Sequence, residues 1–462
     1  MNSIPFIEEI KNNFNKIFDM TSEILTLEHN VFNFSKNLTK MMFISALEGI
    51  DQNFLKSEYR IENYYSKEII HRTLITCFGE IEINYRVYVN KNTGERFSLI
   101  KELLNIKPYQ RVTDEAEYEI VKYAMHSNMT QAGKYAIPDT TLSRSWVSKL
   151  LRKLNGSIHR EISRSIITPK TVYIEMDEIH ANLQVGGNRI CPSAIVHEGH
   201  VDNSAKRKSL KNLVYFATAK ESYKDLWNEI YNYVDKRYDM DKIEYIFISG
   251  DGAAGIKNFD EAFPSGIYVL DKFHCKKNLK KIFKDSATVN LALKYLRNND
   301  EDNFNALVEI ELSKENANVD SIIDAKKYLL NNIQGIINQT HNEYKCPCSM
   351  ESHINHGFAR YITSSPYGFS LDGLDNKLKL LVYNANKIDL TFIDYCNLKY
   401  GENEIEEINN KIYNLQNLKF KYSNLLKNNN QPINYDNVTP IPTFDDNKTK
   451  DFINRLLSHK KI

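Results

Sequence analysis

The sequence predicts an α/β fold built on a mixed sheet, with helical segments before and after it. Two observations carry this prediction. Four short apolar runs typical of buried strands follow one another along the chain, at 171–177, 213–218, 245–249 and 267–270. Helical spacing of apolar residues separates some of them, notably over 223–237. Strands that alternate with helices favour a core in which helices cover a sheet.

The composition is that of a folded protein that is neither strongly charged nor membrane-bound. Of the 462 residues, 60 are Lys or Arg and 59 are Asp or Glu, so the net charge is +1 and only local patches could be basic. The 28 Tyr and 22 Phe exclude global disorder. No apolar run approaches the ~18 residues of a membrane span, and the first residues do not resemble a signal peptide. Six Cys in so long a chain form no disulfide framework, so we expect a cytoplasmic protein without a membrane partner.

Two segments are expected before any DNA-binding or catalytic part. Residues 1–60 carry apolar side chains at helical spacing, beginning at Phe6, and predict helices that pack together or on a partner subunit. Residues 61–112 change to a period of two between Ile81 and Val89, with turn residues on either side. This pattern predicts a small antiparallel sheet.

Residues 113–168 have the outline of a helix-turn-helix DNA-binding segment. One helix begins at Thr113, and 130–136 could form a second. Asp139 or Thr140 can cap a third helix. That helix bears basic side chains suited to DNA phosphates, namely Arg144, Lys149, Arg152 and Lys153. An ordinary three-helix bundle with a solvated basic face explains the same pattern, and this segment alone does not decide between them.

Two aspartates are expected at the ends of core strands. Asp177 ends the first predicted strand, and Asp251 follows the third, between two glycines. Carboxylates at the ends of neighbouring strands point into one crevice and can share divalent cations, and Mg²⁺ prefers such oxygen ligands. For either aspartate taken alone, a turn or helix cap is the alternative.

A third acidic residue, Asp271, follows the fourth predicted strand. His274 comes one helical turn later, so the pair could hydrogen-bond internally or place an imidazole near a substrate phosphate. Lysines that suit contact with a DNA backbone follow, including Lys276 and Lys277. The alternative is a capped, lysine-rich helix. Residues 275–340 are predicted to be almost entirely helical.

The segment from 346 to 360 contains residues that could bind either zinc or Mg²⁺. It contains four zinc-type ligands, Cys346, Cys348, His353 and His356. Their spacings are tighter than zinc sites usually show, but a structural zinc or a zinc-dependent hydrolase remains an alternative. Glu351 lies in the first turn of a predicted helix. It could instead complete a metal site with Asp177 and Asp251.

Taken together, these motifs resemble the bacterial insertion-sequence transposases of the ISLre type, whose members are often grouped as an uncharacterised protein family. The resemblance lies, in order, in Tyr-Ile-Glu-Met-Asp177-Glu-Ile-His, Ser-Gly-Asp251-Gly-Ala-Ala, Leu-Asp271-Lys-Phe-His274, and Glu351 before His-x-x-His356 and Arg360. Such proteins belong to the DDE transposases. The Asp-x-x-His step is also similar to that of mutator-like and hAT-like relatives. Two positions depart from the pattern: Gly255, where we expect an aromatic residue, and Phe369, where we expect Trp.

The resemblance implies a ribonuclease-H-like catalytic core over 169–400, with a helical insertion at about 280–340, and a C-terminal helix and polar tail over 401–462. It implies a DNA transposase that cleaves the ends of an insertion sequence and joins them to target DNA. Asp177, Asp251 and Glu351 would be its catalytic residues and would bind two Mg²⁺ (or Mn²⁺) ions. Accessory roles would fall to Asp271, His274, His356 and Arg360.

The resemblance also implies the partners. These would be double-stranded DNA, at terminal inverted repeats and at the target, and further copies of the chain in a homodimer or higher synaptic assembly. The protein would be nucleoid-associated when bound to DNA. A second hypothesis is a non-catalytic DNA-binding protein derived from a transposase, which would bind DNA without metal-dependent cleavage.

Overall fold

The computed structural model describes residues 24–155, 158, 161–201, 209–363, 368–401 and 404–407. The chain divides into two compact units, 1–408 and 409–462, and the second lies outside the described residues. Residues 1–23 of the predicted N-terminal helices and the predicted polar tail after 407 lie outside the described residues, whereas the later part of the N-terminal prediction is helical, in Ile24–Leu55. Within the described part, no helix has the length and apolar character needed to cross a membrane.

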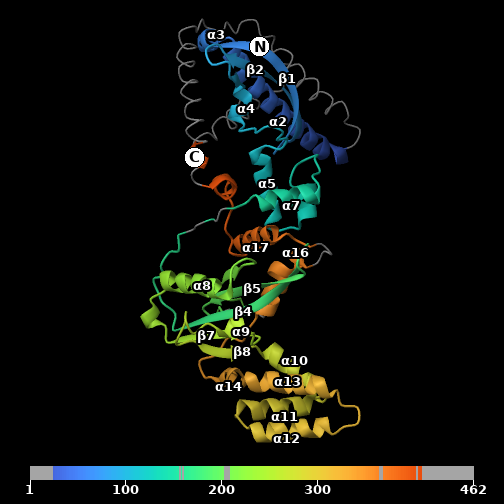
Figure 1. Cartoon of the computed structure of the whole chain (residues 1–462), viewed down its shortest axis with the longest axis vertical. Coiled ribbons are helices and arrows are strands. Elements are labelled where there is room, and N and C mark those ends of the chain that lie inside the picture. The colour runs from blue at the N-terminus through green and yellow to red at the C-terminus, as the bar shows by residue number, and fades with distance from the viewer. Residues whose placement is uncertain are drawn as a thin grey trace. The chain divides into compact units, whose positions relative to one another are not determined.

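The first elements pack a long helix against a small antiparallel sheet (Figure 1). In chain order they are α2 (Ile24–Leu55), α3 (Glu58–Asn63), β1 (Tyr64–Thr76), β2 (Gly79–Asn90), β3 (Arg96–Phe97) and α4 (Leu99–Leu103). Along β2, Ile81, Ile83 and Tyr85 are buried and the residues between them are exposed. The same core contains Leu47 of α2. The predicted antiparallel sheet is therefore confirmed.

Three short helices follow, α5 (Asp114–Ala124), α6 (Met129–Tyr135) and α7 (Arg144–Arg152). Thr113 caps α5 as predicted. The predicted cap of α7 was wrong, because Ser143 accepts the hydrogen bond from the Trp146 N–H. Asp139 instead adopts a left-handed conformation, with φ 53°, and forms an ion pair with Lys36. The turn before α7 is thus longer than the sequence pattern indicated.

The central element is a five-stranded mixed sheet with the order β6-β5-β4-β7-β8. Its strands are β4 (Thr171–Asn182), β5 (Asn188–His197), β6 (Val214–Ala217), β7 (Tyr245–Gly250) and β8 (Ile267–Leu270). β4 is antiparallel to β5 and parallel to β7, β5 is antiparallel to β6, and β7 is parallel to β8. The predicted mixed α/β architecture is therefore confirmed, and all four predicted runs contain strands.

Helix α8 (Tyr223–Arg237) has the predicted bounds and buries Leu226, Trp227 and Ile230 in one core with β4 and β7. The 3₁₀ turn η1 (Met240–Lys242) and helix α9 (Ala254–Lys257) lie on either side of β7 in the chain. Figure 1 shows α8 alongside the sheet.

Strand β5 is absent from the sequence prediction, and Pro192 explains why. A proline normally argues against a strand inside a sheet, because it cannot donate a backbone hydrogen bond. Here the Pro192 carbonyl accepts from the Thr218 N–H, so the backbone of this residue faces the β6 side and not β4. The ladder with β6 begins only at the next residue, Ser193. The missing N–H therefore costs β4 and β5 no bond.

A helical block follows β8, as predicted for 275–340. It comprises α10 (Lys272–Ile282), α11 (Ser286–Arg297), α12 (Glu301–Leu312), α13 (Val319–Asn331), α14 (Ile333–Ile337) and the 3₁₀ turn η2 (Asn338–Thr340). These helices bury a core of their own, which includes Phe283, Phe304 and Leu329. This core also includes Leu270 of β8, so the block packs on the edge of the sheet.

The chain then returns to the sheet through four helical segments. These are α15 (Met350–Ile354), the π-helix η3 (Asn355–Ala359), α16 (Arg360–Ile362) and α17 (Leu371–Ala385). α15 contacts β4 and β5, and α17 contacts both β6 and α7. These contacts bring the start of α15, at Met350 and Glu351, beside β4.

Candidate active site

Asp177 lies inside β4, which corrects the prediction that it ends the strand. The pairing of β4 with β7 stops at Glu175, opposite Ser249, because β7 ends one residue later. β4 itself continues to Asn182 against β5 alone. Asp177 therefore stands just past the end of β7, beside the turn that carries Asp251. Asp251 follows β7 as predicted.

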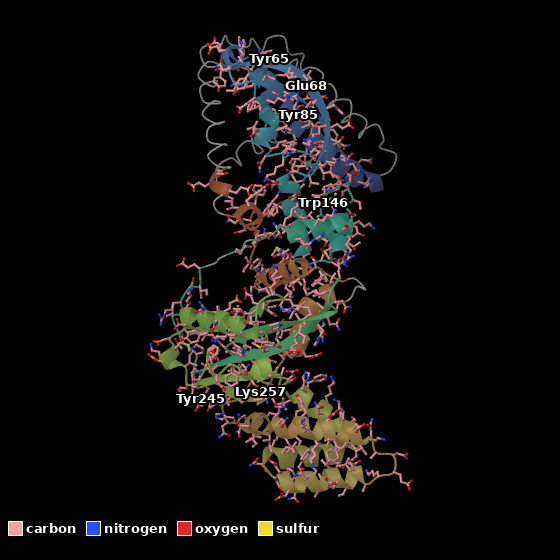
Figure 2. The ribbon with its side chains drawn as sticks, in the orientation of Figure 1. Tyr65, Glu68, Tyr85, Trp146, Tyr245 and Lys257 are labelled. Atoms are coloured by element: carbon pink, nitrogen blue, oxygen red, sulfur yellow. The ribbon has the colours of Figure 1, made fainter. Side chains whose placement is uncertain are left out.

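The turn at Asp251 is held by the helical block. The Tyr328 hydroxyl donates to the Asp251 carbonyl. Gly252 has φ +91°, and a Cβ at this position would lie 2.5 Å from the Asn332 side chain, so only glycine fits without strain. Lys257, labelled in Figure 2, donates to the last carbonyl of α13 at 3.1 Å. The block thus contacts the backbone at Asp251 and the residues that follow it.

Three side chains gather as a possible metal site: Asp177 of β4, His274 of α10 and Glu351 of α15. One ligand atom of each lies within 4.8 Å of the others. His274 Nε2 is 4.0 Å from Glu351 Oε2 and also 4.0 Å from the carboxylate of Asp271. Asp271 itself caps α10 by accepting from the Phe273 N–H. His274, predicted as accessory, therefore stands among the possible ligands, whereas Asp271 is a helix cap.

The pKa of Asp177 is raised to about 6, chiefly by burial and to a smaller extent by the neighbouring carboxylates of Asp251 and Glu351. The backbone N–H of Glu178 and the ring of His274 act in the opposite direction. Asp251 is thus close enough to act on Asp177, although it lies outside the group of three. Three carboxylates that repel one another around one position are an arrangement that a cation stabilises.

The donors present fit Mg²⁺ or Mn²⁺. Two carboxylates supply the oxygen ligands that both ions prefer, and an imidazole is compatible with a transition metal. Within the described part of the chain, His274 Nε2 is buried and has no hydrogen-bond partner. A buried nitrogen without a partner is costly unless something binds it. A cation held by Asp177, Glu351 and His274 would remove that cost.

The other predicted residues of this region are not part of the group formed by Asp177, His274 and Glu351. His356 and Arg360 are exposed on η3 and α16, and the Arg360 guanidinium lies 4.9 Å from the ring of Tyr361. Lys276 and Lys277 are exposed on α10, directly after His274. A π-helical turn such as η3 often marks a functional site.

The four residues of the zinc alternative, Cys346, Cys348, His353 and His356, do not form one possible metal-ligand group among the described residues. His353 Nδ1 is 2.7 Å from the Tyr215 hydroxyl. Cys346 instead joins Glu175 and His197, and this is the second possible metal-ligand group found among the described residues. Glu175 and His197 are not among the site residues that the sequence predicted. The available signal was an acid in an otherwise apolar strand, two positions before Asp177 and therefore on the same face.

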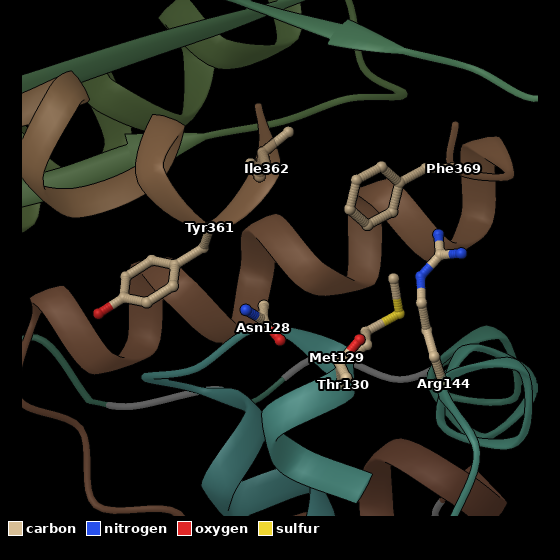
Figure 3. A pocket seen from close by; sticks show the side chains of 7 residues that line it. All are labelled: Asn128, Met129, Thr130, Arg144, Tyr361, Ile362 and Phe369. Carbon is tan, nitrogen blue, oxygen red and sulfur yellow. The ribbon is translucent and has the colours of Figure 1, made fainter. Parts of the chain in front are cut away.

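The basic residues of α7 divide into two sets. Lys149, Arg152 and Lys153 are exposed at the C-terminal end of the helix. Arg144 is half-buried and lines a small pocket together with side chains of α6, α16 and Phe369 (Figure 3). The exposed set fits the predicted phosphate contacts. Arg144 is placed differently, because its guanidinium extends toward Phe369.

The glycine that departs from the expected motif has a steric reason. A Cβ at Gly255 would lie 2.4 Å from the ring of Tyr223. The Tyr223 hydroxyl in turn bonds to Glu178, the neighbour of Asp177. An aromatic ring from α8 therefore occupies the space beside position 255.

Comparison with known proteins gives the family. The profile of an uncharacterised protein family, UPF0236, matches residues 19–397. A UPF0236 protein of Caldanaerobacter subterraneus subsp. tengcongensis is 28 % identical over 454 residues, which cover 95 % of this chain and 96 % of the relative. A second from that strain, also 28 % identical over 454 residues and covering 95 % of each chain, has a name that joins eleven locus designations. A UPF0236 protein in the vanSb 3′ region of Streptococcus gallolyticus is 25 % identical over 285 residues, 59 % of this chain and 61 % of the relative. Since the profile spans most of the sequence, the chain belongs to the uncharacterised protein family UPF0236.

Proposed function

We propose that this protein is a DDE-type DNA transposase, which cleaves the ends of an insertion sequence and joins them to target DNA by metal-dependent phosphoryl transfer. The observation that carries the proposal is the meeting of Asp177 and Glu351, from β4 and α15, with His274, beside Asp251. Chance capping explains one carboxylate at a strand end. It does not explain carboxylates from such distant segments around one position.

The fold supports the same proposal. A mixed five-stranded sheet is followed by a helical block between its last strand, β8, and α15, which is where the resemblance requires an insertion. This arrangement supports a ribonuclease-H-like core. The block also holds the turn at Asp251, so an insertion here has a role in shaping the site.

Each residue then has a task. Asp177, Asp251 and Glu351 would hold two Mg²⁺ or Mn²⁺ ions, with His274 as a further ligand or as a contact to the scissile phosphate. When bound, such ions lower the pKa of water and stabilise charge on the phosphate oxygens. Lys276 and Lys277 would lie along the DNA backbone next to the site, because they follow His274 on the exposed face of α10.

The DNA-binding part would be α5 to α7. The exposed Lys149, Arg152 and Lys153 would contact phosphates of the terminal repeats. Joining two element ends requires both in one complex, so we expect a homodimer or a higher assembly.

The relatives supply independent support. One relative carries eleven locus designations in a single strain. Several loci that share one protein name are what an element that moves its own gene would leave behind.

The direct test is cleavage of the DNA that flanks the gene for this chain. Purified full-length protein is incubated with that DNA and Mg²⁺ or Mn²⁺, with EDTA as the negative control and unrelated DNA of equal length as the specificity control. Metal-dependent cuts at fixed positions in the flanking DNA are expected. Specific binding without cleavage in either metal would instead favour the non-catalytic DNA-binding hypothesis.

A further inference from the structure

The proposed catalytic carboxylate, Glu351, lies in the first turn of α15. α15 is the start of a helical stretch that continues without a break through η3 and α16 to Ile362. Its N-cap residue, Ser349, makes no side-chain capping bond within the helix. The contacts that hold the start of α15 from outside therefore bear on the position of Glu351 relative to Asp177.

The contact that fixes it comes from Glu175, a buried residue of β4 with 1 % of its surface exposed. Its Oε2 accepts from the Ser349 N–H at 2.7 Å and from the Ser349 hydroxyl at 3.1 Å. The Ser349 hydroxyl is thus directed at the strand. Two hydrogen bonds to one carboxylate oxygen tie the start of α15 to the strand that carries Asp177.

The other oxygen of Glu175 is held by a histidine. His197, fully buried on β5, lies with Nε2 3.0 Å from Glu175 Oε1. Its Nδ1 accepts from the Gly199 N–H, so the proton is on Nε2 and is donated to Glu175. The ring also stacks on Tyr173, with 5.2 Å between centroids. Both carboxylate oxygens are therefore occupied, and the carboxylate cannot rotate away from Ser349.

A second anchor starts from β7, at the residue that faces Glu175 across the strand pair. Ser249 Oγ lies 3.1 Å from the Tyr344 hydroxyl, which accepts from the Cys348 N–H at 3.2 Å. Glu175 and Ser249 each stand two positions before a proposed catalytic aspartate. β4 and β7 therefore both anchor the loop before α15, each through a residue close to a proposed catalytic aspartate.

We propose that Glu175, with His197 and Ser349, is a positioning residue that sets the distance of Glu351 from Asp177, assisted by Ser249 and Tyr344. The proposal rests on the proposed function, because it assumes that Asp177 and Glu351 bind a divalent ion together. Such outer partners act through the ligands they orient. Their loss typically lowers metal affinity or activity by about 10–100-fold.

The same cluster contains Cys346, whose Sγ lies 3.4 Å from His200 Nε2. Glu, His and Cys are all zinc ligands, so an ion could in principle hold the loop. The hydrogen bonds argue otherwise, because both oxygens of Glu175 and both nitrogens of His197 already have protein partners. Zinc analysis of the purified protein is therefore part of the test.

The experiment measures Mn²⁺ affinity and the kcat and KM of DNA cleavage for the full-length protein and its variants. Glu175→Gln is expected to lower Mn²⁺ affinity or kcat about 10–100-fold, with little change in KM for DNA. Ser349→Ala and Tyr344→Phe should act in the same direction but less, and Ser349→Thr should retain wild-type values. The matched control is Asp375→Asn. Asp375 is also a buried carboxylate, and it ties α17 to the end of β6 through the Ala219 N–H at 3.0 Å, away from the site.

Three results would overturn the proposal. Glu175→Gln could bind Mn²⁺ and cleave DNA like the wild type, or Asp375→Asn could lose as much as Glu175→Gln. The wild type could also hold about one zinc per chain that Cys346→Ser loses. If the wild type itself neither binds Mn²⁺ nor cleaves DNA, the proposed function fails, and amide exchange then decides the positioning role. If the backbone amide hydrogens of 349–354 exchange faster in Glu175→Gln than in Asp375→Asn, the positioning role is supported. Equal exchange rates in the two variants would exclude that role.

Discussion

Glu175 and Asp177 are two acids on the same face of one strand, and their surroundings are opposite. Glu175 is buried, and both of its oxygens accept hydrogen bonds from protein donors. Asp177 is half-buried, accepts from one backbone N–H, and is surrounded by carboxylates. The first arrangement is complete without a ligand, whereas the second lacks positive charge. The number of donors around a carboxylate, and not its residue type, therefore distinguishes Glu175 from Asp177.

The largest effect expected from this contrast is loss of cleavage when the site acids are neutralised. Asp177→Asn, Asp251→Asn and Glu351→Gln should each reduce metal-dependent cleavage to background, because each removes a carboxylate charge of the kind through which Mg²⁺ is usually bound. DNA affinity, measured without metal, should stay close to that of the wild type. The exposed Asp320→Asn in α13 is a suitable control. Full cleavage by any of the three variants would exclude that residue from the mechanism.

The second expected effect, on the free energy of unfolding, differs between the two acids of β4. Glu175→Gln should lower the free energy of unfolding by about 1–3 kcal/mol, because the amide leaves a buried donor without an acceptor. Asp177→Asn should not lower it, since this change removes a repelled charge. Urea titrations in EDTA measure both. A destabilised Asp177→Asn protein would show that Asp177 is a structural acid after all.

A third region, the basic end of α7, allows DNA binding to be altered without touching either acid. Lys149→Ala and Arg152→Ala should each reduce the slope of log affinity against log salt by about 0.9, the value for one lost phosphate contact. Arg144→Ala should change the slope less, because its guanidinium lies in the pocket beside Phe369. Fluorescence anisotropy with labelled DNA at several salt concentrations tests this. Equal slopes for wild type and Arg152→Ala would contradict the assignment.

The smallest effect is a pH dependence of stability that belongs to Asp177. Its pKa is raised from 3.8 to about 6 on folding, so between these values the folded state binds the proton and the unfolded state does not. Without metal, the free energy of unfolding of the wild type should therefore fall as pH rises through this window. Measured relative to Asp177→Asn, it should be lowest above pH 6. Thermal unfolding in EDTA, as the difference between wild type and variant, measures this. A flat difference would contradict the raised pKa of Asp177, whose largest cause is burial.

Much of the fold was readable from local pattern. The range 223–237 emerged as α8, and the alternation around Ile81 as β2, because each follows from side-chain periodicity alone. β5 was not readable, because Pro192 is tolerated only through its position relative to β6. The cap of α7 moved from Asp139 to Ser143 because Asp139 forms a long-range pair with Lys36.

By itself, the sequence determined which residues are available: the acids Asp177, Asp251 and Glu351, the helical block, and the order in which they occur. Only the tertiary structure decided their relations. It placed His274 beside Asp177 and Glu351, made Asp271 the cap of α10, and brought Glu175 into hydrogen-bond contact with Ser349 at the start of α15. The physical reason is that periodicity and capping act over a few residues. The distance between two carboxylates from β4 and α15 depends instead on how strands, turns and anchoring hydrogen bonds pack together.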